Sequence, residues 1–423
     1  MFVDAAEWFR HRSYDYRQFS DLEELGRRKR ELGLRVSAVL PCRNVAETVG
    51  GIVDEIHAVN ERAGGAPLVE QILAVDADST DGTVEVAASR GAEVYSENEL
   101  MSNHGGAHGK GDAMWRSLSV ARGDLVMYID ADTKDFRPQF VYGILGPILH
   151  VPEVRYVKAA YRRPFKSYES IEQDGGGRVT ELSAKPLFNL FYPELTGFVQ
   201  PLAGEFVADK ELLCSIPFLT GYAVEPGIMI DVLKRVGLAA MAQVDLGTRQ
   251  NRHQPLCDLS RMSYAVLRAV ARRLRQEGRL DQARDPNLPD QLFQFSDYLH
   301  ALATPEGLKL QEYVEELVER PTLDGAWRLT EAPVSQQRRL FEQTTKTAGL
   351  RASTHASDSQ RQKEPEMTRT TGQLPAAAQN EGRTYGQVNP LRRDRITGRS
   401  DSDRRCWPSP KWSQPHGEGR ARG

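Results

Sequence analysis

Cysteine is scarce in this chain. Its 423 residues include four cysteines, and none of them has the Cys-X-X-Cys spacing of a metal or redox motif. We therefore expect neither a zinc cluster nor a disulfide framework, because both need closely matched thiols. Scattered cysteines are typical of proteins that work in a reducing compartment, so we expect a cytoplasmic protein.

The chain also lacks long apolar runs and an excess of basic charge. No apolar stretch approaches the roughly 18 residues of a membrane-spanning helix. The first residues, MFVDAAEWFRHRSYDYRQF, do not show the basic-then-apolar order of a signal peptide. The formal net charge is −3, which provides no basic field for nucleic acid. We therefore expect neither a membrane nor a nucleic acid among the partners.

What the sequence does have is a regular alternation of apolar strands and amphipathic helices. Buried strands are predicted at RVSAVLP, EQILAVDA and DLVMYID, with helical patterns between them. This alternation predicts an α/β fold, with a mostly parallel, Rossmann-like sheet flanked by helices on both faces. Ligands of such sheets bind beyond the carboxyl ends of the strands. The helix in STDGTVEVAASRG is expected to begin at an N-cap, either Ser79 or Thr80.

Composition and periodicity divide the chain into five segments. Residues 1–34 are expected to form an N-terminal helical extension, and residues 35–160 and 161–256 the two halves of the sheet domain. Residues 257–330 are predicted to be helical, most clearly over SRMSYAVLRAVARRLRQ and PEGLKLQEYVEELVERP. Residues 345–423 have few large aliphatic side chains and many Ser, Thr, Gln, Arg, Gly and Pro, so we expect a disordered tail.

The strongest local motif is YIDADT, at the end of a predicted buried strand. Asp130 and Asp132 occupy positions i and i+2, which share one face of a strand. Two carboxylates on one face suit Mg²⁺ or Mn²⁺ shared with a bound diphosphate. Such a cation offsets the charge of a departing diphosphate, which glycosyl transfer from a nucleotide requires. A lone acidic pair is more often a strand cap, so the motif gains weight only from its neighbours.

Three other segments are expected at the same edge of the sheet. VDADSTDGT places Asp76 at a strand end, where it could accept a hydrogen bond from a uracil imide, and the PCRNVAET backbone could line the base and ribose. In SNHGGAHGKGDAMWR, Lys110 follows glycines near a helix N-terminus, where free N–H groups favour a diphosphate. The simpler interpretations are a helix-capping turn, a proline turn and a glycine loop with a solvated lysine.

Later segments supply candidate groups for an acidic second substrate. GGGRVTELSAKP places Arg178 after glycines at a predicted helix start, which suits a phosphate or carboxylate; a flexible linker is the equal alternative. Glu205 and Glu225 fall in apolar segments. A carboxylate in such surroundings is either a structural ion with a partner or a functional group. In LGTRQNRHQPL, His253 could be a third metal ligand and Arg249 could hold the acidic substrate, unless this is only a polar surface loop.

Taken in order, these motifs resemble those of the glucosyl-3-phosphoglycerate synthases, which are retaining glycosyltransferases of the GT-A fold. The resemblance runs from about residue 35 to about residue 256 and rests on VLPCRN, VDADSTDGT, GKGDAMWRS, YIDADT, GRVTELSAKPL, QPLAGE, GYAVEPGIMID and LGTRQNRHQPL. It implies transfer of glucose from UDP-glucose to the 2-hydroxyl of 3-phosphoglycerate, a Mg²⁺ or Mn²⁺ cofactor and a homodimer. Residues 35–160 would then bind the nucleotide sugar, residues 161–256 the acceptor, and residues 257–330 a second subunit.

The resemblance also implies roles for particular residues. The catalytic residues would be Glu225 and Asp132. The donor-binding residues would be Pro41, Cys42, Arg43, Asp76, Lys110, Asp130, Leu202 and Ala203. The acceptor-binding residues would be Gly177, Arg178, Val179, Thr180 and Arg249. The metal ligands would be Asp132 together with His253 or Asn251.

Two positions depart from the family pattern. Val45 stands where the family has an acidic residue, which removes one contact with the donor. By its spacing from Arg249, the metal-binding His of the family falls on Asn251, and the His of this chain comes later, at His253. We favour His253 as the ligand, because imidazole binds Mn²⁺ well.

Three alternative functions remain open on the sequence alone. The same fold could take GDP-mannose as donor, with a larger base pocket near Asp76, or glycerate as acceptor. A sugar nucleotidyltransferase shares the sheet, but it carries a glycine- and arginine-rich loop after its first strand, and PCRNVAET is not one. A sugar-nucleotide-binding protein without catalysis would bind the donor and not turn it over.

Overall fold

The computed structural model describes residues 5–166, 171–172, 176–250, 254–280, 295–304 and 307–323. The chain divides into two units, Met1–Leu340 and Phe341–Gly423, and all of the described residues belong to the first. The tail predicted over residues 345–423 therefore lies outside the described residues.

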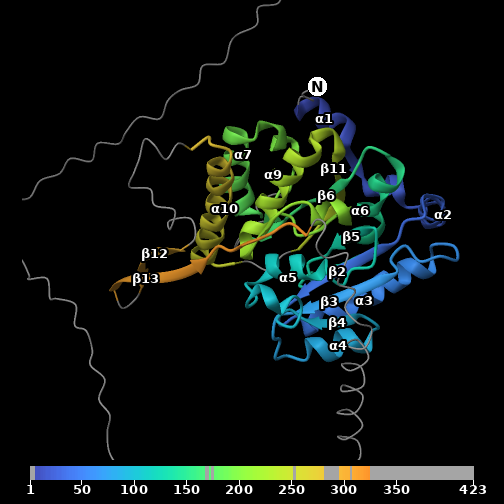
Figure 1. The fold of residues 1–423 in the computed structure, drawn as a ribbon, viewed down its shortest axis with the longest axis horizontal. Helices are drawn as coiled ribbons and strands as arrows, with labels where there is room; N and C mark the ends of the chain where they lie inside the picture. Colours follow the sequence, from blue (N-terminus) through green and yellow to red (C-terminus); the bar gives the residue numbers. More distant parts are fainter. Residues whose placement is uncertain are drawn as a thin grey trace, which may run out of the picture. The chain divides into compact units, whose positions relative to one another are not determined.

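An eight-stranded sheet forms the centre of the described part of the chain, in the order β1-β11-β6-β9-β5-β2-β3-β4 (Figure 1). Its strands are β1 (Ser13–Asp15), β2 (Val36–Cys42), β3 (Gln71–Asp76), β4 (Glu93–Ser96), β5 (Leu125–Tyr128), β6 (Tyr156–Arg162), β9 (Phe206–Asp209) and β11 (Met241–Thr248). Within this sheet the strand pairs are parallel except for those that β9 makes with β5 and β6. The predicted mostly parallel sheet is confirmed. Because β9 runs in the opposite direction, it begins at the edge where its neighbours end.

Helices cover both faces of the sheet (Figure 1). One face packs against α2 (Leu22–Leu32), α3 (Ala46–Glu61) and α6 (Gln139–His150). The other packs against α5 (Lys110–Ser117), α9 (Val224–Val236) and α10 (Leu256–Gln276). Every residue of β3 is buried, as expected for a parallel strand that is covered on both sides. The hydrophobic core therefore consists of two layers separated by the sheet.

The remaining elements are short and complete the edges of this arrangement. The helices are α1 (Ala5–Arg12), α4 (Thr83–Ser89), α7 (Lys185–Phe191), α8 (Lys210–Cys214) and the π-helical turn η3 (Thr180–Ala184). The 3-10 turns are η1 (Tyr16–Phe19), η2 (Ser102–His104), η4 (Pro193–Gly197), η5 (Gly221–Ala223) and η6 (Leu238–Ala240). The strands are β7 (Phe165–Lys166), β8 (Ile171–Glu172), β10 (Phe218–Leu219), β12 (Phe295–Thr304), β13 (Gly307–Glu316) and β14 (Glu319–Arg320).

The N-terminal segment is part of the sheet. β1 pairs in parallel with β11, with Ser13 opposite Gln243. Trp8 of α1 is buried, and its Nε1 donates a hydrogen bond to the carbonyl of Met241 at 2.8 Å. The expected N-terminal extension thus supplies the edge strand of the sheet. No local pattern in the sequence predicts a strand at this position.

The C-terminal region corrects one prediction. α10 confirms the first predicted helix, but the second, over PEGLKLQEYVEELVERP, is wrong. That segment instead contains β13, which pairs with β12 as an antiparallel hairpin, and β14, which pairs with β10. Its leucines and valines fit a helical period, yet Leu308 and Leu310 also alternate as in a strand. Pairing with neighbouring segments decides between the two patterns, and the local sequence does not contain that information.

The start of α4 corrects a second prediction. Its N-cap position is Gly82, with a φ of 90°, so neither Ser79 nor Thr80 caps the helix. Ser79 Oγ instead accepts a hydrogen bond from the backbone N–H of Asn44 at 2.8 Å, and Asp81 Oδ2 accepts one from Ala46 N–H at 3.0 Å. These side chains tie the turn after β3 to the turn after β2, across the edge where the predicted site lies.

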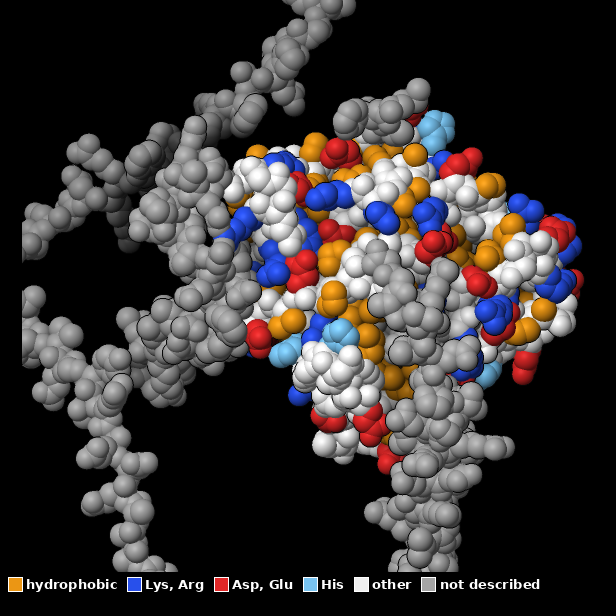
Figure 2. Space-filling view, viewed as in Figure 1, with side chains coloured by type: hydrophobic (Ala, Val, Ile, Leu, Met, Phe, Trp, Pro, Cys, Tyr) orange, Lys and Arg blue, Asp and Glu red, His pale blue; other side chains and the backbone are white. Residues whose placement is uncertain are grey.

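Charged side chains of both signs are interspersed over the face shown in Figure 2. On α2, for example, Arg27 Nη2 lies 2.7 Å from Glu24 Oε1 in an exposed pair. Such pairs contribute little to stability, and they keep the surface polar. None of the described helices is both long and apolar enough to span a membrane.

Candidate active site

A cleft of about 550 Å³ opens at the carboxyl edge of the sheet. Its walls come from the turns after β2, β3, β4 and β5, the start of α5, the first turn of α9, residues 176–180 and one side of α10. The volume suits a nucleotide-sized ligand, and the edge is the one where α/β sheets bind their ligands.

Lys110 lies at the centre of the cleft. It is the first residue of α5, and its Nζ donates hydrogen bonds to Asp130 Oδ1 at 2.6 Å and to Glu225 Oε1 at 2.7 Å. Burial disfavours the charged ammonium, but the two carboxylates outweigh that effect and raise the pKa of Lys110 above its ordinary value. The cleft therefore contains a permanent positive charge that suits a diphosphate.

Asp130 is held from its other side by Arg249, which is fully buried. Arg249 Nη1 donates to Asp130 Oδ2 at 3.1 Å and to the Tyr161 hydroxyl at 2.8 Å, and it forms an ion pair with Glu205. Burial opposes ionisation of Asp130, but Lys110 and Arg249 hold the pKa of its carboxyl well below the ordinary value. Burial raises the pKa of Glu205, with Arg249 opposing it. This ionic cluster forms the floor of the site.

Gly204 makes room for that floor. A Cβ atom at this position would lie 1.9 Å from Asp130 Oδ1 and 2.4 Å from Lys110 Nζ. Any side chain here would displace one of the two charged groups. Because β9 is antiparallel, the residues just before it, Gly204 and Glu205, reach the same edge as the ends of β5 and β11. The motif QPLAGE therefore supplies both the space and a buried carboxylate.

Asp132 is the carboxylate at the mouth of the cleft. Its side chain is 69% exposed, and Arg249 Nη2 lies 3.6 Å from its Oδ1. Asp130, in contrast, is already bonded to two cations. One exposed carboxylate together with substrate phosphate oxygens is an ordinary donor set for Mg²⁺ or Mn²⁺, so Asp132 fits a cation shared with a diphosphate. The described residues contain no group of three or more His, Cys, Asp or Glu placed to hold a metal.

Two arginines line the wall formed by residues 163–164 and 176–180. Arg178, in the segment 176–180, donates from Nη2 to the carbonyl of Gln254 at 3.1 Å. Arg163 donates from Nη2 to the Tyr161 hydroxyl at 2.9 Å, and its buried Nε has no hydrogen-bond partner in the described part of the chain. Two guanidinium groups on one cleft suit an acidic ligand.

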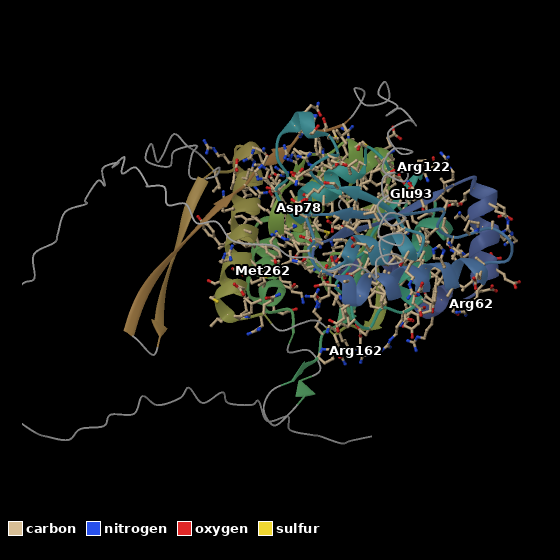
Figure 3. The ribbon with its side chains drawn as sticks, turned by 90° about the horizontal axis from the view of Figure 1, so that it is seen from below. Arg62, Asp78, Glu93, Arg122, Arg162 and Met262 are labelled. Carbon is tan, nitrogen blue, oxygen red and sulfur yellow. The ribbon has the colours of Figure 1, made fainter. Side chains whose placement is uncertain are left out.

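Helix α10 closes this side of the cleft. Met262, labelled in Figure 3, lines it together with Leu259 and Val266. The helix is fixed to α9 by Arg273, whose Nη2 lies 2.6 Å from Asp231 Oδ2. Burial raises the pKa of Asp231 to about 6 in spite of this pair. The sides of the cleft are thus tied to the core by buried ionic contacts.

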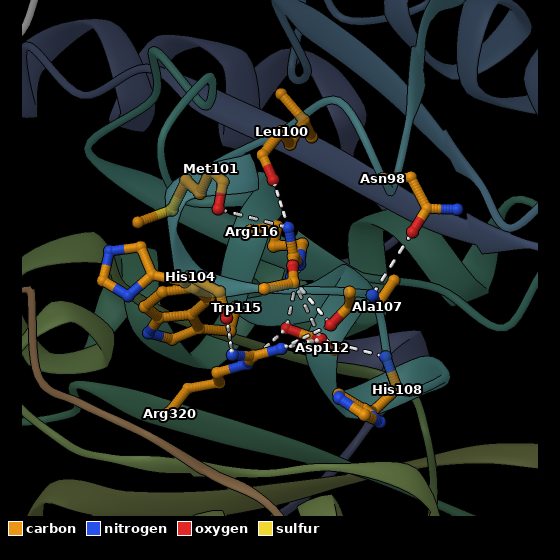
Figure 4. Close-up of polar contacts among 12 residues, drawn as sticks. Asn98, Leu100, Met101, His104, Ala107, His108, Asp112, Trp115, Arg116 and Arg320 are labelled. Atoms are coloured by element: carbon orange, nitrogen blue, oxygen red, sulfur yellow. Dashed lines mark hydrogen bonds and ion pairs between the residues drawn. The ribbon is translucent and has the colours of Figure 1, made fainter.

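The glycine loop before α5 is anchored by two buried arginines (Figure 4). Arg116 Nη2 donates to the carbonyl of Gly105 at 2.7 Å, and its Nε donates to Asp112 Oδ1 at 3.0 Å. Arg320 of β14 donates from Nη2 to the carbonyl of Gly106 at 2.8 Å and to Asp112 Oδ2 at 2.6 Å. A C-terminal strand therefore fixes the loop that presents the central lysine.

The structure brings most of the sequence-predicted residues to this cleft. Those that line it are Pro41, Cys42, Arg43, Lys110, Asp130, Asp132, Gly177, Arg178, Val179, Thr180, Leu202 and Glu225. Asp76, Ala203 and Arg249 are buried beside the cleft and are not part of its lining. Asn251 and His253 lie outside the described residues.

Glu97, Arg163 and Tyr222 are among the lining residues that the sequence-based reasoning missed. Glu97 directly follows β4, and Arg163 directly follows β6. Both residues could have been predicted from the rule that ligands bind where parallel strands end. Tyr222 lies in η5 and within the motif GYAVEPGIMID, in which only Glu225 was assigned a role.

Comparisons with known proteins agree with this geometry. The family model of glycosyl transferase family 2 matches residues 37–162. A glucosyl-3-phosphoglycerate synthase of Petrotoga mobilis is 38% identical over 270 residues, which is 64% of this chain and 82% of that protein. A crystal structure of mannosyl-3-phosphoglycerate synthase from Rubrobacter xylanophilus is 78% identical, with a TM-score of 0.70, and the match covers 76% of this chain and 99% of that one.

A third relative was crystallised with ligands. Glucosyl-3-phosphoglycerate synthase from Mycobacterium tuberculosis, in complex with Mn²⁺, UDP-glucose and phosphoglyceric acid, is 35% identical with a TM-score of 0.59. The match covers 71% of this chain and 94% of that one. The GT-A type sheet, the cleft and these similarities define a glycosyltransferase that moves a hexosyl group. The chain belongs to the glucosyl-3-phosphoglycerate synthase family.

Proposed function

We propose that the chain transfers glucose from UDP-glucose to the 2-hydroxyl of 3-phosphoglycerate, with retention at the anomeric carbon. The observation that carries this proposal is a single cleft with an ammonium and carboxylates on one side and two arginines on the other. The similar enzyme from Mycobacterium tuberculosis holds UDP-glucose, phosphoglyceric acid and Mn²⁺ together.

On the donor side, the base lies against residues 41–43 and the diphosphate beside Lys110. Asp132 would hold Mn²⁺ or Mg²⁺, and such a cation would supply positive charge to the departing diphosphate. Glu225 is fixed by its hydrogen bond to Lys110 and accepts hydrogen bonds from hexose hydroxyls. Lys110 and Glu225 orient each other through this hydrogen bond, so both side chains are in position before the donor binds.

On the acceptor side, the phosphate and carboxylate of 3-phosphoglycerate pair with Arg163 and Arg178. The 2-hydroxyl then attacks the anomeric carbon from the face that the diphosphate leaves. Its proton passes to a donor phosphate oxygen, and Glu225 positions the hexose. The anomeric proton signal in the NMR spectrum of the product tests retention, and an inverted product would exclude this geometry.

A second candidate is mannosyl transfer from GDP-mannose to the same acceptor. The 78% identity to the mannosyl-3-phosphoglycerate synthase of Rubrobacter xylanophilus specifically favours it. The two candidates share the acceptor, the cation and the central lysine, and they differ in the base and the hexose. Parallel assays with both donors, and with glycerate in place of 3-phosphoglycerate, separate them.

The assay follows nucleoside diphosphate release with Mn²⁺ or Mg²⁺ present. We expect release only when 3-phosphoglycerate is supplied, and a drop of about 100-fold or more in Asp132→Ala, because the cation loses its carboxylate ligand. Asp54→Ala is the matched control: its carboxylate pairs with Arg90 on the surface, and we expect full activity. Donor binding without release would instead identify a sugar-nucleotide-binding protein.

The same assay addresses the second metal ligand. We propose His253, with Asn251 as the alternative, and the two are compared as Ala variants across a range of Mn²⁺ concentrations. The ligand's variant should need more Mn²⁺ for half-maximal activity, because it contributes directly to the affinity for the ion. If both variants match the unmodified enzyme, neither residue binds the metal.

We also propose a cytoplasmic homodimer. Cys42 and Cys257 form no disulfide, which suits a reducing compartment. Leu182, Leu190 and Leu267 are 77%, 71% and 44% exposed, which suits an interface between subunits. Light scattering should give twice the mass of one chain, and the mass of a single chain would refute the dimer.

A further inference from the structure

The hydroxyl of Tyr161, which is buried beside the cleft, makes three hydrogen bonds. It accepts from Arg163 Nη2 at 2.9 Å and from Arg249 Nη1 at 2.8 Å, and it donates to Glu205 Oε2 at 2.9 Å. Both arginines also contact the ring of Tyr161: the Cζ atom of Arg163 lies 5.0 Å from the ring centroid, and that of Arg249 lies 5.4 Å from it. A tyrosine hydroxyl has one proton and two lone pairs, so these three contacts satisfy it completely.

The partners fix the direction of each of these hydrogen bonds. A guanidinium group can only donate, so the hydroxyl proton is directed to the carboxylate of Glu205. Burial raises the pKa of Tyr161 in spite of the two arginines, and the hydroxyl therefore keeps its proton at neutral pH. The hydroxyl thus connects the two guanidinium groups with one buried carboxylate in a single arrangement.

The two arginines depend on this hydroxyl to different degrees. Arg249 has other partners, because it also bonds to Asp130, to Thr133 Oγ1 at 2.9 Å and to Glu205. Within the described part of the chain, the side chain of Arg163 forms its hydrogen bond with Tyr161 and pairs with no carboxylate. The charge of Arg249 is therefore compensated, whereas that of Arg163 remains available to a ligand in the cleft, which Arg163 lines.

The backbone of Arg163 is held beside the other arginine of this wall. The N–H of Gly176 donates to the Arg163 carbonyl at 2.9 Å. A Cβ atom on Gly176 would lie 2.6 Å from the Cβ of Arg163, so only glycine permits this close approach. The contact brings Arg163 next to residues 176–180, which include Arg178. With its backbone fixed, Arg163 depends on Tyr161 for the direction of its guanidinium group.

We propose that Tyr161 is a positioning residue for the acidic acceptor, and that it acts by holding the Arg163 guanidinium group at the wall of the cleft. An arginine loses rotamer freedom when it binds an anion, and a hydrogen bond that holds it beforehand reduces this cost. A hydroxyl suits this role because, unlike a carboxylate, it orients the guanidinium group without neutralising it. The inference rests on the proposed function, in which Arg163 and Arg178 bind 3-phosphoglycerate.

The test is calorimetric titration of the full chain with 3-phosphoglycerate in the absence of nucleotide. In Tyr161→Phe, we expect the dissociation constant to rise about tenfold, since a hydrogen bond to a charged group is lost. UDP and GDP, each titrated with Mn²⁺, should bind as they do to the unmodified protein, because Arg249 keeps its other contacts. Tyr128→Phe is the matched control: it removes a buried hydroxyl that donates to the Met114 carbonyl at 2.9 Å, and it should leave both affinities unchanged.

A double-mutant cycle separates positioning of Arg163 from general support of the fold. In a chain that already carries Arg163→Met, Tyr161→Phe should cause no further loss of affinity for 3-phosphoglycerate, because no guanidinium group is left to position. A loss by the same factor in both backgrounds would show that Tyr161 acts independently of Arg163, and it would overturn the inference.

The outcomes separate this inference from the proposed function. Binding of 3-phosphoglycerate that depends on Tyr161 through Arg163, without hexosyl transfer to it, would overturn only the proposed function. Transfer with an acceptor affinity that Tyr161→Phe leaves unchanged, or with equal losses of acceptor and nucleotide affinity, would overturn only the role of Tyr161. Failure of the unmodified protein to bind 3-phosphoglycerate would overturn both.

Discussion

Replacing Lys110 with Met is expected to lower kcat about 100- to 1000-fold. The substitution removes the positive charge beside the leaving diphosphate, and it also frees Asp130 and Glu225 from the contacts that orient them. Both effects act on the transition state more than on substrate binding, so KM should change less than kcat. Steady-state release of the nucleoside diphosphate measures both constants.

The matched control is Lys134→Met. Lys134 Nζ lies 2.9 Å from Glu47 Oε1, in a pair whose side chains are 63% and 76% exposed. An exposed pair of this kind contributes little, so we expect nearly unchanged kcat and stability. If Lys110→Met kept more than a tenth of the activity, the central lysine would not stabilise the leaving group.

Replacing Arg249 with Met is expected to lower the free energy of unfolding by about 3–5 kcal/mol. The guanidinium is the counter-charge of Glu205 and part of that of Asp130, and all three groups are buried or nearly so. Removing one partner of a buried pair leaves the other charge uncompensated. Urea unfolding at pH 7 measures the loss. Arg90→Met, which breaks an exposed pair with Asp54, is the control and should cost less than about 1 kcal/mol.

The loss caused by Arg249→Met should shrink as the pH falls from 7 to 5. In the unmodified protein the pKa of Asp130 is depressed, so Asp130 stays ionised from pH 7 to 5 and its stabilising contribution does not change over this range. The pKa of Glu205 is raised by burial even with Arg249 present, and without that cation it rises further. The folded variant then takes up protons that the unfolded chain does not, and acid stabilises it relative to neutral pH. A deficit that stays constant over this range would contradict the uncompensated charge as its cause.

The sequence was most informative about the residues at strand ends. The sequence placed Asp130 and Lys110 at the same edge, because Asp130 follows a parallel strand and Lys110 begins the helix that precedes this strand. In the structure the two side chains are in direct contact. The exposed Asp132 followed from the same strand. In each case a local pattern and one general rule about parallel sheets were sufficient.

The floor of the site required information that the local sequence does not hold. Glu205 and Arg249 were both singled out, but their contact depends on β9 running antiparallel, which brings its first residues to the active edge. Tyr161 joins them from a position 44 residues before Glu205 and 88 before Arg249. Long-range pairing of strands also decided the C-terminal hairpin, where the helical period of the sequence misled.

The anchoring of the glycine loop by Arg320 affects when, during synthesis of the chain, this loop becomes fixed. Arg320 reaches Asp112 across 208 positions of the chain. All eight strands of the sheet precede Arg320 in the chain, so the sheet can assemble before Arg320 has been synthesised. Until then, the loop that presents Lys110 lacks the hydrogen bonds that Arg320 donates to Gly106 and Asp112. In a chain of 423 residues, the glycine loop is therefore anchored only after about three quarters of the polypeptide has been synthesised.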